Sequence, residues 1–294
     1  MPHSRFWHGR RPLSVVGMTP KVALVTGATQ GLGLALVEGL AQRLTPADTV
    51  YLTGRDLDRV TTAAEGVPGG GAEVRAALLD VADPTAAARF ADQLRERHGG
   101  VDIVFGNAVM RVGPDDDPPT FIDQYVEVNN LGTTRILRAF APLLRDNGRL
   151  IIVASSLGTL RYLAPVLHSR FDDLPSLDEV DRQVSAWRDA VRNGTVRASA
   201  WPGFVNIPSK IGQVAAVRTL ARSRRDADLA RGILLASVCP GMMNTPTSGV
   251  WWDVATAPTP AQAAVALLDL ALDPVKPEHY GELLLDGAVL PWKP

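Results

Sequence analysis

The sequence predicts an α/β fold in which a doubly wound parallel sheet is flanked by helices. Short apolar segments rich in β-branched residues alternate along the chain with segments that have helical periodicity. The segment Arg149–Val153 is almost entirely apolar, as expected for a strand that is buried on both faces. A glycine-rich stretch, Gly27–Gly33, directly follows the first apolar segment, so a tight turn joins the first strand to the first helix.

The expected elements begin with the strand Lys21–Thr26, which ends at Gly27 and precedes apolar residues at helical spacing from Leu32 to Leu40. The last expected helix begins at Thr259-Pro260, and Gln262 completes a capping box there. The other expected strands are Thr49–Thr53, Val74–Leu79, Val101–Phe105, Arg149–Val153, Gly232–Val238 and Glu282–Leu285, and the other expected core helices are Pro84–His98, Tyr125–Arg145 and Ile207–Ala230.

Residues 158–201 interrupt this alternation, because they contain no strand signal. Ser176 and Glu179 have the spacing of a capping box, and apolar residues including Trp187 follow at helical spacing. Gly194 lies where a helix commonly ends in a left-handed residue. We therefore expect a helical insertion before the fifth core helix, within a single domain of residues 19–294 that follows a flexible arm of residues 1–18.

Composition excludes several classes of protein. The chain of 294 residues is 46% hydrophobic and 21% charged, with a net charge of −1, so nothing draws it to nucleic acid or to an anionic membrane. Cys239 is the only cysteine, which excludes an internal disulfide and a thiolate metal site. No apolar run approaches the ~20 residues of a membrane span. We expect a cytoplasmic protein without a metal site.

The glycine-rich stretch predicts a dinucleotide site. Gly27 permits the turn, Gly31 lets the backbone approach a pyrophosphate, and Gly33 allows the helix to pack closely on the sheet. The helix N-terminus adds N–H groups and a positive dipole that favour phosphate. Glycines also occur in ordinary tight turns, but the strand–turn–helix context favours the dinucleotide interpretation.

The stretch TGATQGLGLA resembles the glycine motif of the short-chain dehydrogenase/reductase family, and further matches run in order over residues 20–290. Asn107-Ala108 matches half of the family's N-N-A-G motif, although Gly106 and Val109 replace the outer residues. The long insertion is most similar to the carbonyl-reductase branch. The resemblance implies a Rossmann-type fold and a cofactor site made of Gly27, Thr29, Gln30, Gly31, Leu32, Gly33, Arg55, Asp80, Val81, Asn107, Ala108, Lys210, Pro240, Gly241, Met243 and Thr245.

The end of the second strand favours NADPH/NADP+ as the cofactor. Sites that prefer NAD place a carboxylate there for the ribose 2′-hydroxyl, whereas this chain has Gly54 followed by Arg55. The Arg55 guanidinium can pair with a 2′-phosphate. Asp56 lies two residues too far along for the carboxylate role. The alternative is that Arg55 is only a solvated surface charge.

The family's Y-x-x-x-K motif reads here as Asn206-Ile-Pro-Ser-Lys210, so the resemblance implies a catalytic set with an asparagine in place of the tyrosine acid. A carboxamide is too weak an acid to protonate a carbonyl oxygen, whereas Lys210 can still bind the nicotinamide ribose. Asn206 has a structural alternative as an N-cap that accepts from the Ser209 N–H. The implied catalytic residues are Ser155, Asn129, Lys210 and Asn206.

An aromatic substrate is indicated by a group of large flat or flexible side chains near the nicotinamide loop, although core packing is the alternative interpretation. Only four of the 30 basic residues are lysines, as in proteins of GC-rich bacteria. Together these features resemble the ketoreductases of aromatic polyketide antibiotic pathways. The candidate substrate-binding residues are Phe204, Met242, Trp251 and Trp252.

The sequence therefore predicts an NADPH-dependent ketoreductase that reduces a ketone of a polycyclic aromatic polyketide. The missing proton is expected from a substrate phenol or from water, and Arg161, Tyr162 and His168 of the insertion are further candidates. The rival hypothesis is a non-catalytic NADPH-binding sensor or scaffold that has lost its tyrosine. Resemblance to carbonyl reductases implies that the insertion covers the surface used for tetramers, so we expect a monomer.

Overall fold

The computed structural model describes residues 19–294, and the arm expected at residues 1–18 lies outside the described residues. A sheet of eight strands has the order β3-β2-β1-β4-β5-β6-β7-β8, and every neighbouring pair is parallel except β7 and β8. The strand order reverses between β1 and β4, where α/β folds commonly bind ligands at the carboxyl ends of the strands. The strands are β1 Val22–Val25, β2 Thr49–Gly54, β3 Glu73–Leu78, β4 Val101–Gly106, β5 Leu144–Val153, β6 Leu234–Cys239, β7 Leu283–Leu285 and β8 Ala288–Leu290.

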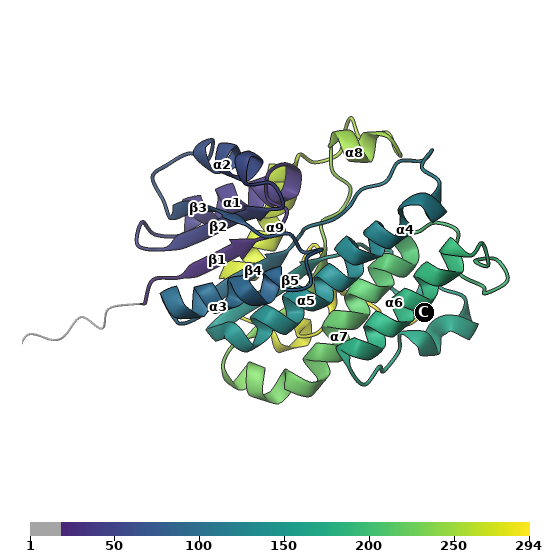
Figure 1. The fold of residues 1–294 in the computed structure, drawn as a ribbon. Coiled ribbons are helices and arrows are strands. Elements are labelled where there is room, and N and C mark those ends of the chain that lie inside the picture. Colours follow the sequence, from purple (N-terminus) through teal and green to yellow (C-terminus); the bar gives the residue numbers. More distant parts are fainter. Residues whose placement is uncertain (1–18) are drawn as a thin grey trace, which may run out of the picture.

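Helices cover both faces of the sheet, which confirms the doubly wound Rossmann-type fold. Helices α3, α5 and α7 lie side by side on one face, and α1 and α9 pack together on the other (Figure 1). The helices are α1 Gly31–Arg43, α2 Leu57–Glu65, α3 Ala86–His98, α4 Pro118–Val126, α5 Gly132–Phe140, α6 Leu177–Arg192, α7 Asn206–Ala230, α8 Pro246–Gly249 and α9 Pro260–Leu272.

The prediction of a single helix over Tyr125–Arg145 is wrong in its bounds. Helix α4 begins earlier, at Pro118, and a π-helical turn, Glu127–Leu131, separates it from α5. After α5 a short 3-10 turn contains Pro142, and β5 then begins at Leu144, before the expected residue 149. Proline has no N–H and restricts the residue before it, so the helix cannot continue regularly through this point.

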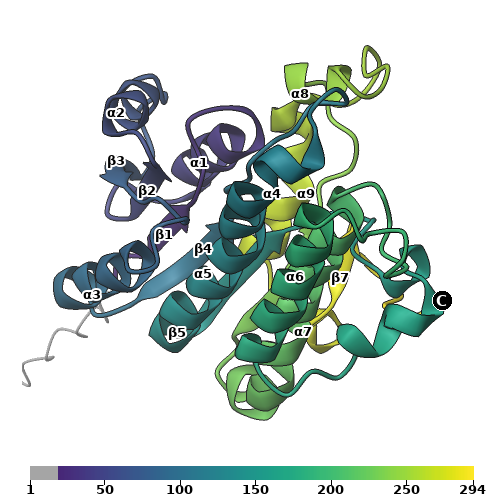
Figure 2. The same ribbon diagram turned by 45° about the vertical axis from the view of Figure 1, so that its right-hand side comes forward.

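The insertion is helical, as expected, and it contains the 3-10 turns Leu160–Tyr162 and Pro165–Arg170 before α6. The Ser176 hydroxyl caps α6 by accepting from the Glu179 N–H at 3.3 Å, whereas the Glu179 carboxylate accepts from Gln183 instead of closing the capping box. Gly194 has the expected left-handed conformation, with φ of +68°. Helix α6 packs against α4 and α7 (Figure 2).

Two apolar clusters make up the core. The larger one lies between the sheet and its covering helices, and the second joins the insertion to α4 and α7 around the buried Trp187. The C-terminal segment belongs to this second cluster through the buried side chain of Trp292. The Leu160 N–H also donates to the Trp292 carbonyl at 2.9 Å. Within residues 19–294, no helix combines the length and the apolar character that crossing a bilayer demands.

Candidate active site

The glycine loop after β1 is held against the end of β4. Asn107 Nδ2 donates to the carbonyls of Thr26 at 3.0 Å and Gly27 at 3.1 Å, and the Thr26 hydroxyl accepts from the Asn107 and Ala108 N–H groups. Gly27 has φ of +62°, and a Cβ there would lie 2.6 Å from Ala108 Cα. A Cβ on Gly33 would lie 2.5 Å from the Gly27 carbonyl oxygen, so both positions require glycine.

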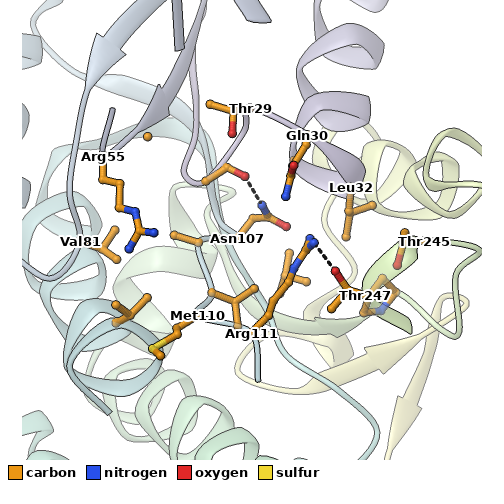
Figure 3. A pocket seen from close by; sticks show the side chains of 18 of the residues that line it. Thr29, Gln30, Leu32, Arg55, Val81, Asn107, Met110, Arg111, Thr245 and Thr247 are labelled. Atoms are coloured by element: carbon orange, nitrogen blue, oxygen red, sulfur yellow. Dashed lines mark hydrogen bonds between the residues drawn. The ribbon is translucent and has the colours of Figure 1, made fainter. Parts of the chain in front are cut away.

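A cavity of about 590 Å³ lies beside this loop, where the strand order reverses (Figure 3). Gly31 and Gly241 are the two members of the expected cofactor site that are not among its lining residues. The members that do line it are Gly27, Thr29, Gln30, Leu32, Gly33, Arg55, Asp80, Val81, Asn107, Ala108, Lys210, Pro240, Met243 and Thr245.

The N-terminus of α1 faces this loop without a side-chain cap. Gln30 is the N-cap residue and its side chain accepts no hydrogen bond from the helix, and the first turn of α1 carries no acidic residue. The N–H groups of the first turn therefore remain available to an anion, and the helix dipole favours negative charge there. The loop and the helix together fit the pyrophosphate of a dinucleotide.

One end of the cavity carries two arginines. Arg55 follows β2, and Arg59 lies one helical turn later in α2. Asp56 caps α2 by accepting from the Arg59 N–H at 3.2 Å. No carboxylate among residues 19–294 lies within 4.0 Å of either guanidinium. Arg59 was not predicted, although its spacing from Arg55 could have indicated it.

Arg111 also lines the cavity, beside the glycine loop, and no sequence pattern predicted it. Its Nη1 donates to the Thr247 hydroxyl at 2.5 Å, which bridges the β4–α4 loop and α8 (Figure 3). Its Nη2 would lie 3.6 Å from a Cβ on Gly31. Partial burial lowers the pKa of Arg111, and no carboxylate among residues 19–294 pairs with it. A cation without a carboxylate partner beside the glycine loop is suited to an anionic group.

Lys210 lines the cavity from α7. Its Nζ donates to Gln213 Oε1 at 2.7 Å and lies 3.5 Å from the Val153 carbonyl oxygen. Burial lowers the pKa of Lys210 to about 8, and the nearby Cys239 opposes this shift. The amine can therefore change its charge near physiological pH.

Asn206 does not cap α7, so that expectation is wrong. The N-cap is Val205, whose carbonyl accepts from the Ser209 N–H at 3.4 Å, and Asn206 is the first helical residue. The helix starts one residue earlier than expected because the backbone satisfies the Ser209 N–H. The Asn206 side chain turns toward α4 instead, where its Oδ1 accepts from the Tyr125 hydroxyl at 2.5 Å.

Tyr125 is a neighbour of this site that the sequence analysis missed. Its side chain is only 1% exposed, and burial raises the pKa of its hydroxyl to about 12. It does not line the cavity. The Tyr125 hydroxyl is thus a weak acid, and its hydrogen is already donated to the Asn206 side-chain oxygen.

The other two expected catalytic residues are not among the residues that line the cavity. Asn129 is fully buried in the π-helical turn, where its Oδ1 accepts from the Met110 N–H at 2.7 Å and its Nδ2 donates to the Met110 carbonyl at 3.2 Å. It therefore anchors the loop that carries Arg111. The Ser155 hydroxyl accepts from the Leu157 N–H at 3.2 Å. Of the four expected catalytic residues, Lys210 alone lines the cavity.

The expected substrate residues form a group of rings next to the start of α7. The ring centroids of Phe204 and Trp251 lie 5.4 Å apart, and those of Trp251 and Trp252 lie 6.0 Å apart. Trp251 Nε1 donates to the Val112 carbonyl at 3.1 Å. Trp252 is 45% exposed and Met242 is 44% exposed. These side chains lie outside the dinucleotide cavity, on the segments before α7 and after β6.

The insertion residues considered as proton donors also lie outside the cavity. The Arg161 guanidinium lies over the ring of Tyr162, and His168 Nε2 is 2.9 Å from the Leu163 carbonyl oxygen. No group of three acidic, histidine or cysteine side chains within residues 19–294 has the geometry of a metal site. The chemistry of the described cavity is that of a nucleotide site with a partly buried amine.

Comparison with known proteins agrees with this geometry. The short chain dehydrogenase family model matches residues 21–167. Carbonyl reductase (NADPH) 1 of Sus scrofa is 30% identical over 92% of this chain and 94% of its own length. Carbonyl reductase (NADPH) 1 of Mus musculus is 29% identical over 92% of this chain and 98% of its own length.

Solved structures share the fold. Menthone neomenthol reductase from Mentha piperita superposes with a TM-score of 0.72 at 22% identity, over 92% of this chain and 100% of that one. A short chain dehydrogenase from Burkholderia cenocepacia in complex with NADP has a TM-score of 0.64 at 24% identity, over 91% of this chain and 97% of that one. The glycine loop, the family match and the similarity over nearly the whole chain lead to one conclusion: the chain belongs to the short chain dehydrogenase family.

Proposed function

We propose that this protein is an NADPH-dependent reductase that converts a ketone on a polycyclic aromatic polyketide, of angucyclinone type, into an alcohol. The observation that carries the reductase assignment is the shared cavity, with Arg55 and Arg59 at one end and the Lys210 amine in its wall. Two arginines without carboxylate partners favour the 2′-phosphate of NADP(H) over the free hydroxyl of NAD(H). The relatives named carbonyl reductase (NADPH) support the same cofactor.

When bound, NADPH supplies the hydride that adds to the carbonyl carbon. Lys210 is suited to hold the nicotinamide ribose through its ammonium group, and Arg55 and Arg59 to hold the adenosine end. The glycine loop and the α1 N-terminus hold the phosphates between them. These contacts fix the distance and direction of hydride transfer, and such positioning lowers the barrier of the reaction.

The source of the proton for the carbonyl oxygen differs from the usual tyrosine. The carbonyl oxygen gains a proton as the hydride arrives, and the Asn206 carboxamide cannot release one near neutral pH. Tyr125 donates to Asn206, is buried and has a pKa of about 12. We therefore assign the proton to a substrate phenol beside the ketone, which transfers it to the oxygen and regains one from water. Water beside Ser155 is the alternative source.

The polyketide assignment rests on the partly exposed aromatic group that the segments before α7 and after β6 form together. Phe204, Trp251 and Trp252 offer flat faces to a planar ligand, and Met242 adds a flexible apolar contact. A phenol next to a ketone is a regular feature of aromatic polyketides. In these respects the chain resembles the angucyclinone ketoreductase of simocyclinone biosynthesis.

An NADPH oxidation assay tests this function. Purified protein is mixed with NADPH and a panel of aromatic polyketide ketones, and NADPH absorbance is followed together with the alcohol product. We expect oxidation with phenol-bearing ketones. Tight NADPH binding without oxidation across the panel would instead support the second candidate, a sensor or scaffold, which Asn206 and the altered Gly106 and Val109 positions favour.

We also propose that the protein acts as a cytoplasmic monomer. Helix α6 and its flanking turns bury the outer sides of α4 and α7, and Trp187 lies at the centre of that contact. Those helix faces are therefore unavailable to a second copy. Analytical ultracentrifugation at assay concentration tests this, with the mass of a single chain, 31.4 kDa, as the expected result.

A further inference from the structure

Gln213 connects Lys210 to the interior of the protein. Its side chain is 2% exposed and lies between α7 and α5. Gln213 Oε1 accepts from Lys210 Nζ at 2.7 Å, and Gln213 Nε2 donates to the Thr133 hydroxyl at 2.9 Å. The Thr133 hydroxyl in turn donates to the Asn129 carbonyl at 2.7 Å. This row of bonds ends in the π-helical turn.

The direction of these bonds fixes how the Gln213 amide lies. The Thr133 hydroxyl has a single hydrogen, which it gives to the Asn129 carbonyl, so it can only accept from Gln213. The amide nitrogen of Gln213 must then face Thr133, and its oxygen must face Lys210. A flipped amide would place two donors against each other at Lys210 and two acceptors against each other at Thr133.

The charge of Lys210 depends strongly on this one acceptor. No carboxylate among residues 19–294 lies within 4.0 Å of Lys210 Nζ, and its other hydrogen-bond partner, the Val153 carbonyl, is 3.5 Å away. The titratable group that acts on its charge is Cys239 of β6. A partly buried ammonium without an ion-pair partner is stabilised mainly by the oxygens that it contacts.

We propose that Gln213 is a positioning residue that holds the Lys210 ammonium at the cavity wall and keeps it charged for contact with the cofactor ribose. The Thr133 hydroxyl orients Gln213, and the backbone carbonyl of Asn129 orients the Thr133 hydroxyl. Loss of either hydrogen bond therefore weakens the bond between Gln213 and Lys210. The Gln213 carboxamide cannot pass a proton to Lys210. This agrees with the proposal that the proton added to the carbonyl oxygen comes from the substrate. The inference rests on the proposed dinucleotide site.

NADPH binding across a pH series tests this inference without any substrate. The dissociation constant is measured by fluorescence between pH 6.5 and 9.5 for the wild type, Gln213→Met, Gln213→Glu and Thr133→Val. A lysine is charged below its pKa, so wild-type affinity is expected to fall as the pH rises through about 8. Thr219→Val, which removes a buried polar group elsewhere on α7, is the matched control and is expected to keep the wild-type profile.

Gln213→Met removes the acceptor, so the fall in affinity is expected about one pH unit lower, with roughly tenfold weaker binding at pH 8. Gln213→Glu adds a carboxylate and is expected to move the fall to higher pH, and Thr133→Val is expected to give a smaller shift in the direction of Gln213→Met. Folding of each variant is checked by circular dichroism, and opposite shifts in two folded variants exclude a general loss of structure.

The outcomes separate this inference from the proposed function. If the wild type does not bind NADPH at any pH, the proposed cofactor site is wrong. If the wild type binds NADPH while Gln213→Met and Gln213→Glu both keep its affinity and its pH profile, the site stands and the role of Gln213 is overturned.

Discussion

The Tyr125 hydroxyl donates a hydrogen bond of 2.5 Å to the Asn206 side-chain oxygen, and this bond ties α4 to the first turn of α7. The bond uses the side chain that we propose to stand in place of the family's tyrosine acid, and it uses the hydroxyl of Tyr125 as well. Both groups are therefore committed to holding the two helices together. Of the residues that the sequence predicted to be catalytic, Lys210 is then the one that lines the cavity, and it carries a titratable group.

Tyr125→Phe is expected to destabilise the folded protein by about 1 kcal/mol, because it leaves the Asn206 oxygen without its donor. Urea unfolding followed by circular dichroism measures the change in free energy. Tyr162→Phe is the matched control, since Tyr162 is 40% exposed and forms no such bond between helices. Equal stabilities for the two variants would mean that the Tyr125 bond contributes nothing to the fold.

Asn206→Ala is expected to lower turnover by less than about tenfold, whereas loss of a true general acid costs about a hundredfold or more. The reason is that the carboxamide releases no proton. Steady-state kinetics with a phenol-bearing ketone gives the comparison, and Lys210→Ala is expected to raise the NADPH dissociation constant in parallel assays. Loss of turnover in a folded Asn206→Ala protein that binds NADPH normally would assign Asn206 a direct catalytic role.

Arg55→Ala is expected to weaken NADPH binding by roughly tenfold to a hundredfold while NADH binding changes little, because a charge-assisted hydrogen bond contributes about 1.5–3 kcal/mol. The ratio of the two dissociation constants is the measured quantity. A parallel loss for both cofactors would place Arg55 away from the 2′-phosphate.

Arg111→Ala is expected to behave differently, with NADPH and NADH weakened by a similar factor of about ten. Arg111 lies beside Gly31 and Thr247 and apart from Arg55, where a group shared by both cofactors would bind. The same titrations measure it. Thr247→Ala tests whether its bond to the guanidinium positions Arg111, and a selective loss of NADPH alone in Arg111→Ala would contradict this placement.

Much of the fold was predictable because its signals are local. Apolar segments between turn signals located seven of the strands, and Thr259 and Gln262 form the expected capping box, with both bonds present at the start of α9. Strand β8 was missed although Asp286-Gly287 is a strong hairpin signal, and both residues have positive φ. The preceding strand is short and the chain ends soon afterwards, so periodicity alone did not reveal the pair.

The candidate site was predictable only in part, because its remaining features are tertiary. The glycine loop, Arg55 and Lys210 are located by motifs, and each lines the cavity. Arg111 and Tyr125 are located by contacts between segments that are far apart in the sequence, with Thr247 and Asn206 respectively. The cap expected at Asn206 failed for the same reason, since α4 offered its side chain a partner that local rules do not include.

The rate of NADPH oxidation with a phenol-bearing ketone, compared with that of its O-methyl ether, tests the central claim most directly. The claim is that the substrate supplies the proton that the protein lacks. With both ketones at saturating concentration and binding verified for each, the phenol is expected to be reduced at least about a hundredfold faster, the scale of a general-acid contribution. Equal rates for the two ketones would contradict the claim and assign the proton to water or to the protein.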